Sequence, residues 1–254
     1  NTVNPRDQMK SAMVDNTLGH TAPFSRITKD SGAAAVINGN FFAAYSSFKV
    51  PIGHVMVDGE FLYGNSGVSS LGITADGQLR IGRPALFTRI KSAGGTAWAA
   101  YEVNTASQTA LGCTLYTPAY GKSVAIKADG SLLTVRDGVI TEFRAVSAGT
   151  AAAIPAGGFV AFMGPQYTSA HYFRTPAVGT AVELEYYLHR EDDEGFTLDG
   201  LESVISGAPR LVQDGVIVTT LEPGFTEARF TTSSTPRTAV GVNAQGKLLL
   251  VSVP

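Results

Sequence analysis

The sequence predicts a single β-dominated domain with a few helices. Short alternating apolar runs flank the Asp-Gly pairs Asp58-Gly59, Asp76-Gly77, Asp129-Gly130 and Asp137-Gly138. Asp-Gly between alternating runs is a strong hairpin signal. We find no repeat of solenoid period and no heptad pattern. No low-complexity linker divides the 254 residues, a length that one large domain can hold.

The first elements in chain order are a helix and a strand. We expect the helix over Thr21–Ala33, because Thr21 is a candidate N-cap, Pro23 suits the first turn and Phe24 and Ile27 share one face. The next stretch, Ala33–Phe42, predicts a strand that ends in a sharp turn at Asn38-Gly39-Asn40, since Asn and Gly tolerate left-handed backbone geometry.

The rest of the chain reads as β-structure. Hairpins are expected over Val50–Gly82, further strands between residues 83 and 125, and a meander over Ser123–Arg144. Single strands are expected at Ile154–Met163 and Val182–Leu188. This pattern of short strands and turns predicts sheets rather than a helical bundle.

Composition limits the classes of function. The net charge is −2 and no cluster of Lys or Arg occurs, which argues against a nucleic-acid binder. Only 16% of residues are charged, below the ~25% of typical globular proteins, and this suits a secreted or cell-envelope protein. No run reaches the ~18 apolar residues of a membrane span. The single cysteine, Cys113, excludes an internal disulfide and is expected to be buried.

Two Pro-Arg pairs mark the stretch Ser206–Val242. Pro209-Arg210 and Pro236-Arg237 each precede a strand-like run. Proline fixes its own φ and biases the preceding residue toward extended geometry. Arginine offers a planar fork of donors that matches phosphate or carboxylate. Two such arginines at the mouths of buried strands indicate an anion site. The alternative is two strand-end arginines that satisfy loop carbonyls or form surface ion pairs.

Other polar residues are weaker candidates. Asn38 and Asn40 place two carboxamides at the end of the predicted strand, where they either bind a ligand or only form a turn. His54 lies in the first hairpin region and is either a proton-transfer residue or a satisfied core histidine. Neither pattern decides between its two interpretations.

One acidic loop, His189–Gly200, is the only charge cluster. Asp192, Asp193, Glu194 and Asp199 supply oxygen ligands of the kind that Ca²⁺ takes in flexible loops. Their spacing does not match an EF-hand, so a solvated loop is the alternative. We expect no other metal and no cofactor.

Three motifs occur in order along the chain: AAVINGNFF at Ala34–Phe42, SGAPRLVQDG at Ser206–Gly215 and STPRTAVGV at Ser234–Val242. A weaker one, LYTPAYG, lies at Leu115–Gly121. Together they resemble the phosphodiester glycosidase family, which includes the lysosomal uncovering enzyme that removes N-acetylglucosamine from a phosphodiester-linked mannose. Bacterial relatives are often described as exopolysaccharide or envelope proteins.

The resemblance implies an α+β fold with β-rich mixed sheets over residues 21–254, preceded by an N-terminal extension at 1–20. It also implies a pocket. Asn38, Gly39 and Asn40 would line it, with Gly39 making room. Arg210 and Arg237 would flank the phosphate, and the substrate would be a sugar 1-phosphodiester or an envelope glycan.

The same resemblance adds further candidates. Ser206 and Gly207 of the second motif would contact the substrate. A carboxylate would act as nucleophile or base, and Glu227, just before the PRTAVG run, is a candidate within this chain. His54 is the weaker candidate for proton transfer.

The sequence departs from the family pattern after Val242. In the family a helix and a Gly-rich acidic loop follow this strand, and Leu248–Pro254 contains neither. We therefore expect the domain to be C-terminally incomplete, with the absent part cleaved off, disordered, or held as a second chain or fragment that completes the fold. The competing functions are a glycan- or polyanion-binding module without chemistry, and a structural subunit of a surface assembly.

Overall fold

The computed structural model describes residues 2–3, 9–64, 68–188, 196–222, 224–230 and 232–254. Within these ranges the strands form two five-stranded sheets, two three-stranded sheets and two two-stranded ladders. Helices are few and short. They are α1 (Phe24–Ser31), α2 (Pro165–Thr168), α3 (Glu227–Phe230) and the 3₁₀ turns η1 (Val14–Asn16) and η2 (Pro118–Tyr120). The predicted single-domain, β-rich α+β fold is confirmed.

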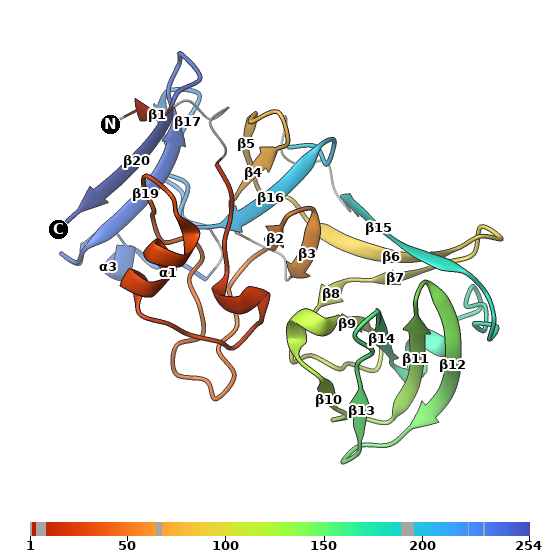
Figure 1. Cartoon of the computed structure of the whole chain (residues 1–254). Coiled ribbons are helices and arrows are strands. Elements are labelled where there is room, and N and C mark those ends of the chain that lie inside the picture. Colours follow the sequence, from red (N-terminus) through yellow and green to blue (C-terminus); the bar gives the residue numbers. More distant parts are fainter. Residues whose placement is uncertain (1, 4–8, 65–67, 189–195, 223, 231) are drawn as a thin grey trace.

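The largest sheets make up the body of the molecule (Figure 1). The first has the order β12 (Val139–Val146), β11 (Gly130–Arg136), β14 (Gly158–Met163), β9 (Cys113–Tyr116) and β8 (Glu102–Val103). The second has the order β3 (Glu60–Tyr63), β2 (Val55–Val57), β16 (Leu201–Ser206), β4 (Ser70–Thr74) and β5 (Leu79–Gly82). All of these neighbours are antiparallel except β8 and β9, which run parallel.

Smaller sheets surround these two. Their strands are β15 (Val182–Leu188), β6 (Leu86–Ser92) and β7 (Ala97–Ala100) in one, and β1 (Thr2–Val3), β20 (Leu248–Val253) and β19 (Arg237–Val242) in another. The ladders pair β10 (Ser123–Ala125) with β13 (Ala151–Ala153), and β17 (Val212–Gln213) with β18 (Val216–Ile217). Figure 1 shows β1, β20 and β19 at one end of the molecule and the β8–β14 sheet at the other.

Turn chemistry explains most hairpins. Asp58-Gly59 joins β2 to β3 and Asp137-Gly138 joins β11 to β12, and all four residues have positive φ, as a type I′ turn requires. Asp76-Gly77 joins β4 to β5 as expected. The pair Asp129-Gly130 leads from β10 into β11 without a hairpin, because β10 pairs with β13 instead.

Three apolar clusters form the core. The largest cluster lies between the first five-stranded sheet, the β15–β6–β7 sheet and the second five-stranded sheet. It includes Ile90, Leu133, Met163 and Val204. A second cluster lies under β10 and β13, and a third lies around Leu18, Val55 and Leu62. Cys113 is fully buried, as expected, and burial raises the pKa of its thiol to about 12.

One predicted helix is confirmed and one predicted strand is wrong. Helix α1 lies within the predicted Thr21–Ala33, although Pro23 rather than Thr21 is its N-cap, and Gly32 ends it with φ of 60°. The stretch Ala33–Phe42 forms no strand, and only Phe42 makes an isolated bridge, to Pro51. None of the described helices is long and apolar enough to cross a bilayer.

Candidate functional site

The segment Asn38–Phe41 connects the predicted site residues. It is irregular backbone beside the end of β16. Asn38 Oδ1 accepts a hydrogen bond of 2.8 Å from Thr238 Oγ1 on β19. Asn40 contacts Ser206 on β16. Asn38 therefore contacts β19, the strand that begins at Arg237, and Asn40 contacts β16, the strand that precedes Arg210.

The side-chain amide of Asn40 is occupied by backbone groups. Its Nδ2 donates to the carbonyls of Ile52 and His54, both at 3.0 Å, and its Oδ1 accepts from the Ser206 N–H at 3.0 Å. An amide with both kinds of group engaged holds the local backbone together. The Asn40 amide therefore fixes the loop to the end of β16.

Ser206 forms the centre of a buried polar network. Its Oγ accepts from the His54 N–H at 2.7 Å and lies 2.8 Å from Ser70 Oγ. Ser206 and Ser70 are both buried. The network joins β16, β4 and the chain just before β2, so three segments far apart in the sequence are fixed at one point.

Gly53 permits this close approach. A Cβ at that position would lie 2.3 Å from Ser206 Cβ, and the φ of Gly53 is +89°. Both facts exclude an ordinary side chain. The contact between His54 and Ser206 therefore depends on a glycine that precedes the histidine.

His54 is buried and uncharged at neutral pH. Its ring is 0% exposed, and Nε2 lies 3.0 Å from the Pro84 carbonyl oxygen, to which it donates. Burial lowers its pKa to about 4, partly offset by the bond to Pro84. Nδ1 has no partner among the described residues. In this structure the ring has no contact with solvent, so the geometry supports a positioning role more than proton transfer with a substrate.

A buried carboxylate, Glu222, binds both Arg210 and Ser69, the chain neighbour of Ser70. Glu222 is 6% exposed. It accepts from the Ser69 N–H at 2.9 Å, from Ser69 Oγ at 2.6 Å and from the Arg210 N–H at 3.2 Å. Three donors around one carboxylate compensate for its burial. Glu222 and Ser69 therefore form the base on which Arg210 is held.

The guanidinium of Arg210 is fixed by its neighbours. Its Nε lies 3.3 Å from Ser69 Oγ and its Nη1 donates to Gln213 Oε1 at 3.0 Å. Arg210 itself lies in no strand, and both residues of β17, which follows it, are exposed. The expected buried strand after Arg210 is wrong, because the short β17–β18 ladder packs no residue into the core.

Arg237 lies at the start of β19. Its Nη1 donates to Thr235 Oγ1 and to the Pro236 carbonyl, and its Cζ lies 5.8 Å from the centroid of the Phe230 ring. The described residues of β19 are exposed or half-buried, so the expectation of a buried strand is wrong here too. The bond from Arg237 to the Pro236 carbonyl is of the kind expected if this arginine only satisfies loop carbonyls at the end of a strand.

The remaining predicted residues are Gly207, Gly39 and Glu227. Gly207 N–H donates to the Ser69 carbonyl at 2.9 Å. A Cβ at Gly39 would meet Ile205 at an ordinary 3.6 Å, so sterics do not demand glycine there. Glu227 is the exposed first residue of α3. The structure thus joins Asn40, His54 and Ser206 directly. Arg210 bonds to Ser69, the chain neighbour of Ser70, and Asn38 bonds to Thr238 on β19.

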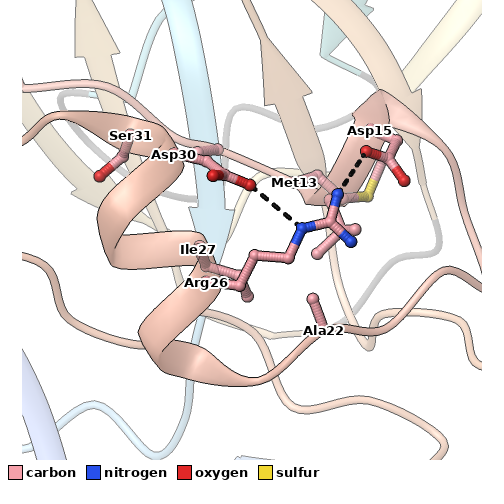
Figure 2. Close-up of a pocket in the computed structure, with 9 residues that line it drawn as sticks. Met13, Asp15, Ala22, Arg26, Ile27, Asp30 and Ser31 are labelled. Atoms are coloured by element: carbon pink, nitrogen blue, oxygen red, sulfur yellow. Dashed lines mark hydrogen bonds and ion pairs between the residues drawn. The ribbon is translucent and has the colours of Figure 1, made fainter.

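A separate pocket lies between α1 and the N-terminal segment, with a volume of about 200 Å³ (Figure 2). Arg26 reaches into it and contacts Asp15 at 3.3 Å and Asp30 at 3.2 Å. None of the predicted site residues lines it. Its charges are already paired, so it does not define the site.

The predicted Ca²⁺ loop falls mostly outside the described residues. Asp192, Asp193 and Glu194 lie there, and Asp199 is described with its carbonyl bound to Arg80 Nη1 at 2.7 Å. In the part of the chain that the structure describes, no group of three or more His, Cys, Asp or Glu side chains could hold a metal ion.

Sequence reasoning missed Glu222, Ser69, Ser70 and Gly53. Glu222 follows the mostly apolar run Val216–Leu221 and precedes Pro223-Gly224, where no motif identifies it. Ser69 and Ser70 resemble any Ser pair at the start of a strand. Gly53 precedes the candidate residue His54. A glycine at the start of a strand can indicate that another segment approaches the backbone closely, and this was a signal in the sequence for the contact with Ser206.

Comparisons with known proteins agree with the sequence motifs. Residues 129–254 match the family model described as phosphodiester glycosidase. Two solved structures each share the fold over 99% of this chain. One is a hypothetical protein from Synechocystis, 24% identical with a TM-score of 0.75. The other, from Burkholderia pseudomallei K96243, is provisionally described as exported and is 19% identical with a TM-score of 0.64.

The matches differ in extent. The present chain covers 46% of the Synechocystis protein and 60% of the Burkholderia protein, so it spans less than two thirds of either. No protein of the curated set matches it.

Proposed function

Residues 129–254 of this chain belong to the phosphodiester glycosidase family, and from that assignment we propose that the protein hydrolyses a sugar 1-phosphodiester. One observation supports this most. Ser206, from the segment that matches the family, bonds to Asn40, His54 and Ser70, and Arg210 from the same segment bonds to Ser69, the chain neighbour of Ser70. An anion-binding residue is thereby held at a rigid point.

The chemistry needs few groups. A phosphodiester is a good leaving group, so the sugar–oxygen bond can break with less acid assistance than in ordinary glycosides. The transition state then has oxocarbenium character on the sugar and charge on the departing phosphate. Fixed donors aimed at that charge supply the main stabilisation. We assign this task to Arg210 and Arg237.

The polar residues take two kinds of role. Asn38 is exposed, and its Oδ1 is bound to Thr238, so we propose that its Nδ2 donates to sugar hydroxyls or phosphate. The exposed backbone at Gly207 would contact the substrate beside it. Asn40, His54 and Ser206 are positioning residues in this proposal, because their polar atoms already bind one another.

Two carboxylates are available, and we assign them different tasks. Glu222 is buried against Ser69 and the Arg210 backbone, so it positions Arg210. Glu227 is exposed on α3, so it is the proposed nucleophile or base. An exposed carboxylate can reach a substrate. A buried carboxylate that accepts three hydrogen bonds would lose free energy by breaking them, because its donors would be left unpaired.

The first test measures sugar release. The protein is incubated with a methyl ester of N-acetylglucosamine-1-phosphate and with UDP-N-acetylglucosamine, and free sugar is quantified. Arg210→Ala and Arg237→Ala should each lower kcat/KM by about 10²–10³-fold, as the loss of one charge-stabilising donor does. Arg144→Ala is the matched control, because Arg144 is an exposed arginine that pairs with Glu142 on β12.

Each result has a defined meaning. Release by the wild type that both Arg210→Ala and Arg237→Ala slow by about 10²–10³-fold supports the proposal. Saccharide binding without release favours a glycan-binding module instead. Neither binding nor release favours a structural role. Unchanged turnover in Arg237→Ala would remove Arg237 from the mechanism.

A second test separates the carboxylates. Glu227→Gln should lower kcat with little change in KM, because it removes a group that acts in the chemical step. Glu222→Gln should raise KM for the phosphodiester, because the amide cannot accept from all three donors and Arg210 loses its position. The reverse pattern would exchange the two roles.

We also propose that the protein acts outside the cytoplasm, in the secreted or envelope fraction. The low charge content supports this, as does the similarity in fold to a protein provisionally described as exported. Fractionation of cells that express the full-length gene, with detection of the protein in each fraction, tests it.

A further inference from the structure

Three phenylalanine rings form a surface cluster beside the candidate site. Phe225 and Phe230 pack edge-to-face with centroids 4.8 Å apart. The ring of Phe41 lies 5.9 Å from Phe225 and 6.0 Å from Phe230. Phe41 is 44% exposed, and the other two are half-buried. We call these three residues the phenylalanine cluster.

The cluster is built from the same segments as the site. Phe41 follows Asn40 directly, and the Phe225 N–H donates to the Glu222 carbonyl at 3.1 Å. The Cζ of Arg237 lies 5.8 Å from the Phe230 centroid. An apolar surface and a cation therefore adjoin each other next to Asn38 and Asn40.

This combination suits one kind of ligand. A pyranose has a face of C–H groups that packs on aromatic rings, whose faces carry negative charge. The adjacent guanidinium complements an anionic substituent on that sugar. A hydrocarbon chain would use the rings but not the cation, and free phosphate would use the cation but not the rings.

We propose that the phenylalanine cluster is the subsite that binds the sugar ring of a sugar 1-phosphate group, with the phosphate directed toward Arg237. The inference rests on the proposed function and adds to it the residues that recognise the sugar. It assigns Phe41 and Phe230 to substrate specificity rather than to the chemical step.

The test compares three ligands in one binding assay. Calorimetry measures Kd for N-acetylglucosamine-1-phosphate or glucose-1-phosphate, for inorganic phosphate and for octyl phosphate. Phe41→Leu and Phe230→Leu keep an apolar side chain and remove the ring. Each should raise the Kd for the sugar phosphates by roughly three- to tenfold, the range expected for one lost aromatic contact, and leave the Kd for inorganic phosphate within about twofold.

The control is Phe24→Leu, the same change at a phenylalanine on α1 that is 50% exposed and lies outside the cluster. It should change no Kd. Thermal unfolding of all three variants checks that the fold is retained. An equal loss for sugar phosphate and inorganic phosphate, or no binding of either sugar phosphate by the wild type, would overturn the subsite. A matching loss for octyl phosphate would overturn its assignment to a sugar.

Failure of the subsite and failure of the proposed function give different results. Ring-dependent binding of sugar phosphate without release of sugar from any phosphodiester retains the subsite and rejects the hydrolase. Turnover by the wild type with unchanged KM in Phe41→Leu and Phe230→Leu retains the hydrolase and rejects the subsite.

Discussion

The sheet body and the outer layer of this molecule are built differently. The body comprises the two five-stranded sheets, and the outer layer comprises residues 24–50 and 207–254. Every residue of β9 is buried, as is all but the first residue of β14. No residue of β17, β18 or β19 is buried. These three strands therefore gain little from apolar burial, and polar contacts such as those of Arg210 with Glu222 and Ser69 contribute more to their position.

These polar contacts coincide with the candidate site. Ser206, Ser70 and His54 belong to the edge of the body, whereas Asn40, Arg210 and Glu222 come from the outer layer. The residues proposed to act on a ligand thus lie where a rigid sheet meets exposed loops. This agrees with the general pattern in which a scaffold positions functional loops.

The largest expected effect contrasts one buried ring with one exposed side chain. Phe162 is 0% exposed and Ile217 is 75% exposed. Phe162→Ala should lower the free energy of unfolding by about 3–5 kcal/mol, because it leaves a cavity in the body. Ile217→Ala should change it by less than about 0.5 kcal/mol. Urea denaturation measures both. A large cost for Ile217→Ala would mean that the β17–β18 ladder is covered in solution.

The next prediction concerns pH. Burial holds the pKa of His54 at about 4, against an ordinary 6.5. Between these values the unfolded chain binds a proton that the folded chain does not. The contribution of His54 to the free energy of unfolding is therefore fully present above pH 6.5. It decreases as the pH is lowered from 6.5 to about 4 and stays constant below about pH 4. The loss amounts to about 3 kcal/mol.

Denaturation at pH 7.5 and pH 4.5 checks this in the wild type and in His54→Gln, which should lose that part of the pH dependence. His20→Gln is the matched control for removal of a histidine, since His20 is exposed beside Asp15. If His54→Gln followed the wild-type curve, the buried ring would not be the cause.

The smallest effect distinguishes two glycines. Gly53 and Gly215 both have positive φ, but a Cβ would clash with Ser206 only at Gly53 and would meet nothing within 4 Å at Gly215. Gly215→Ala should cost about 1–2 kcal/mol from backbone geometry alone. Gly53→Ala should cost about 1–3 kcal/mol more, because a methyl group must be forced between packed atoms. Equal costs in thermal unfolding would show that the contact of Gly53 with Ser206 is loose.

Local turn chemistry accounts for the part of the fold that the sequence predicts well. Asp58-Gly59 and Asp137-Gly138 determine hairpins because both positions of a type I′ turn need positive φ. Gly32 ends α1 for a similar reason. Each signal lies within a few residues of the structure that it determines.

The candidate site could be predicted only in part. The motifs identify Asn38, Asn40, Ser206 and Arg210, and of these Asn40 and Ser206 bond to each other. Asn38 bonds to Thr238 and Arg210 to Ser69. Their individual tasks depend on partners far away in the chain. Ser69 and Glu222 are 153 residues apart, and no local sequence pattern predicts that they bind each other. The failed strand at Ala33–Phe42 has the same origin, because no neighbouring strand pairs with residues 33–41.

The Asn40 side chain takes the place that a neighbouring strand would fill. Its carboxamide presents one acceptor and two donors to the backbone, one donor more than a peptide unit offers. The Asn40 side chain thereby links the backbone just before β2 to the end of β16. One side chain thus tethers the connecting loop at the residue before Phe41.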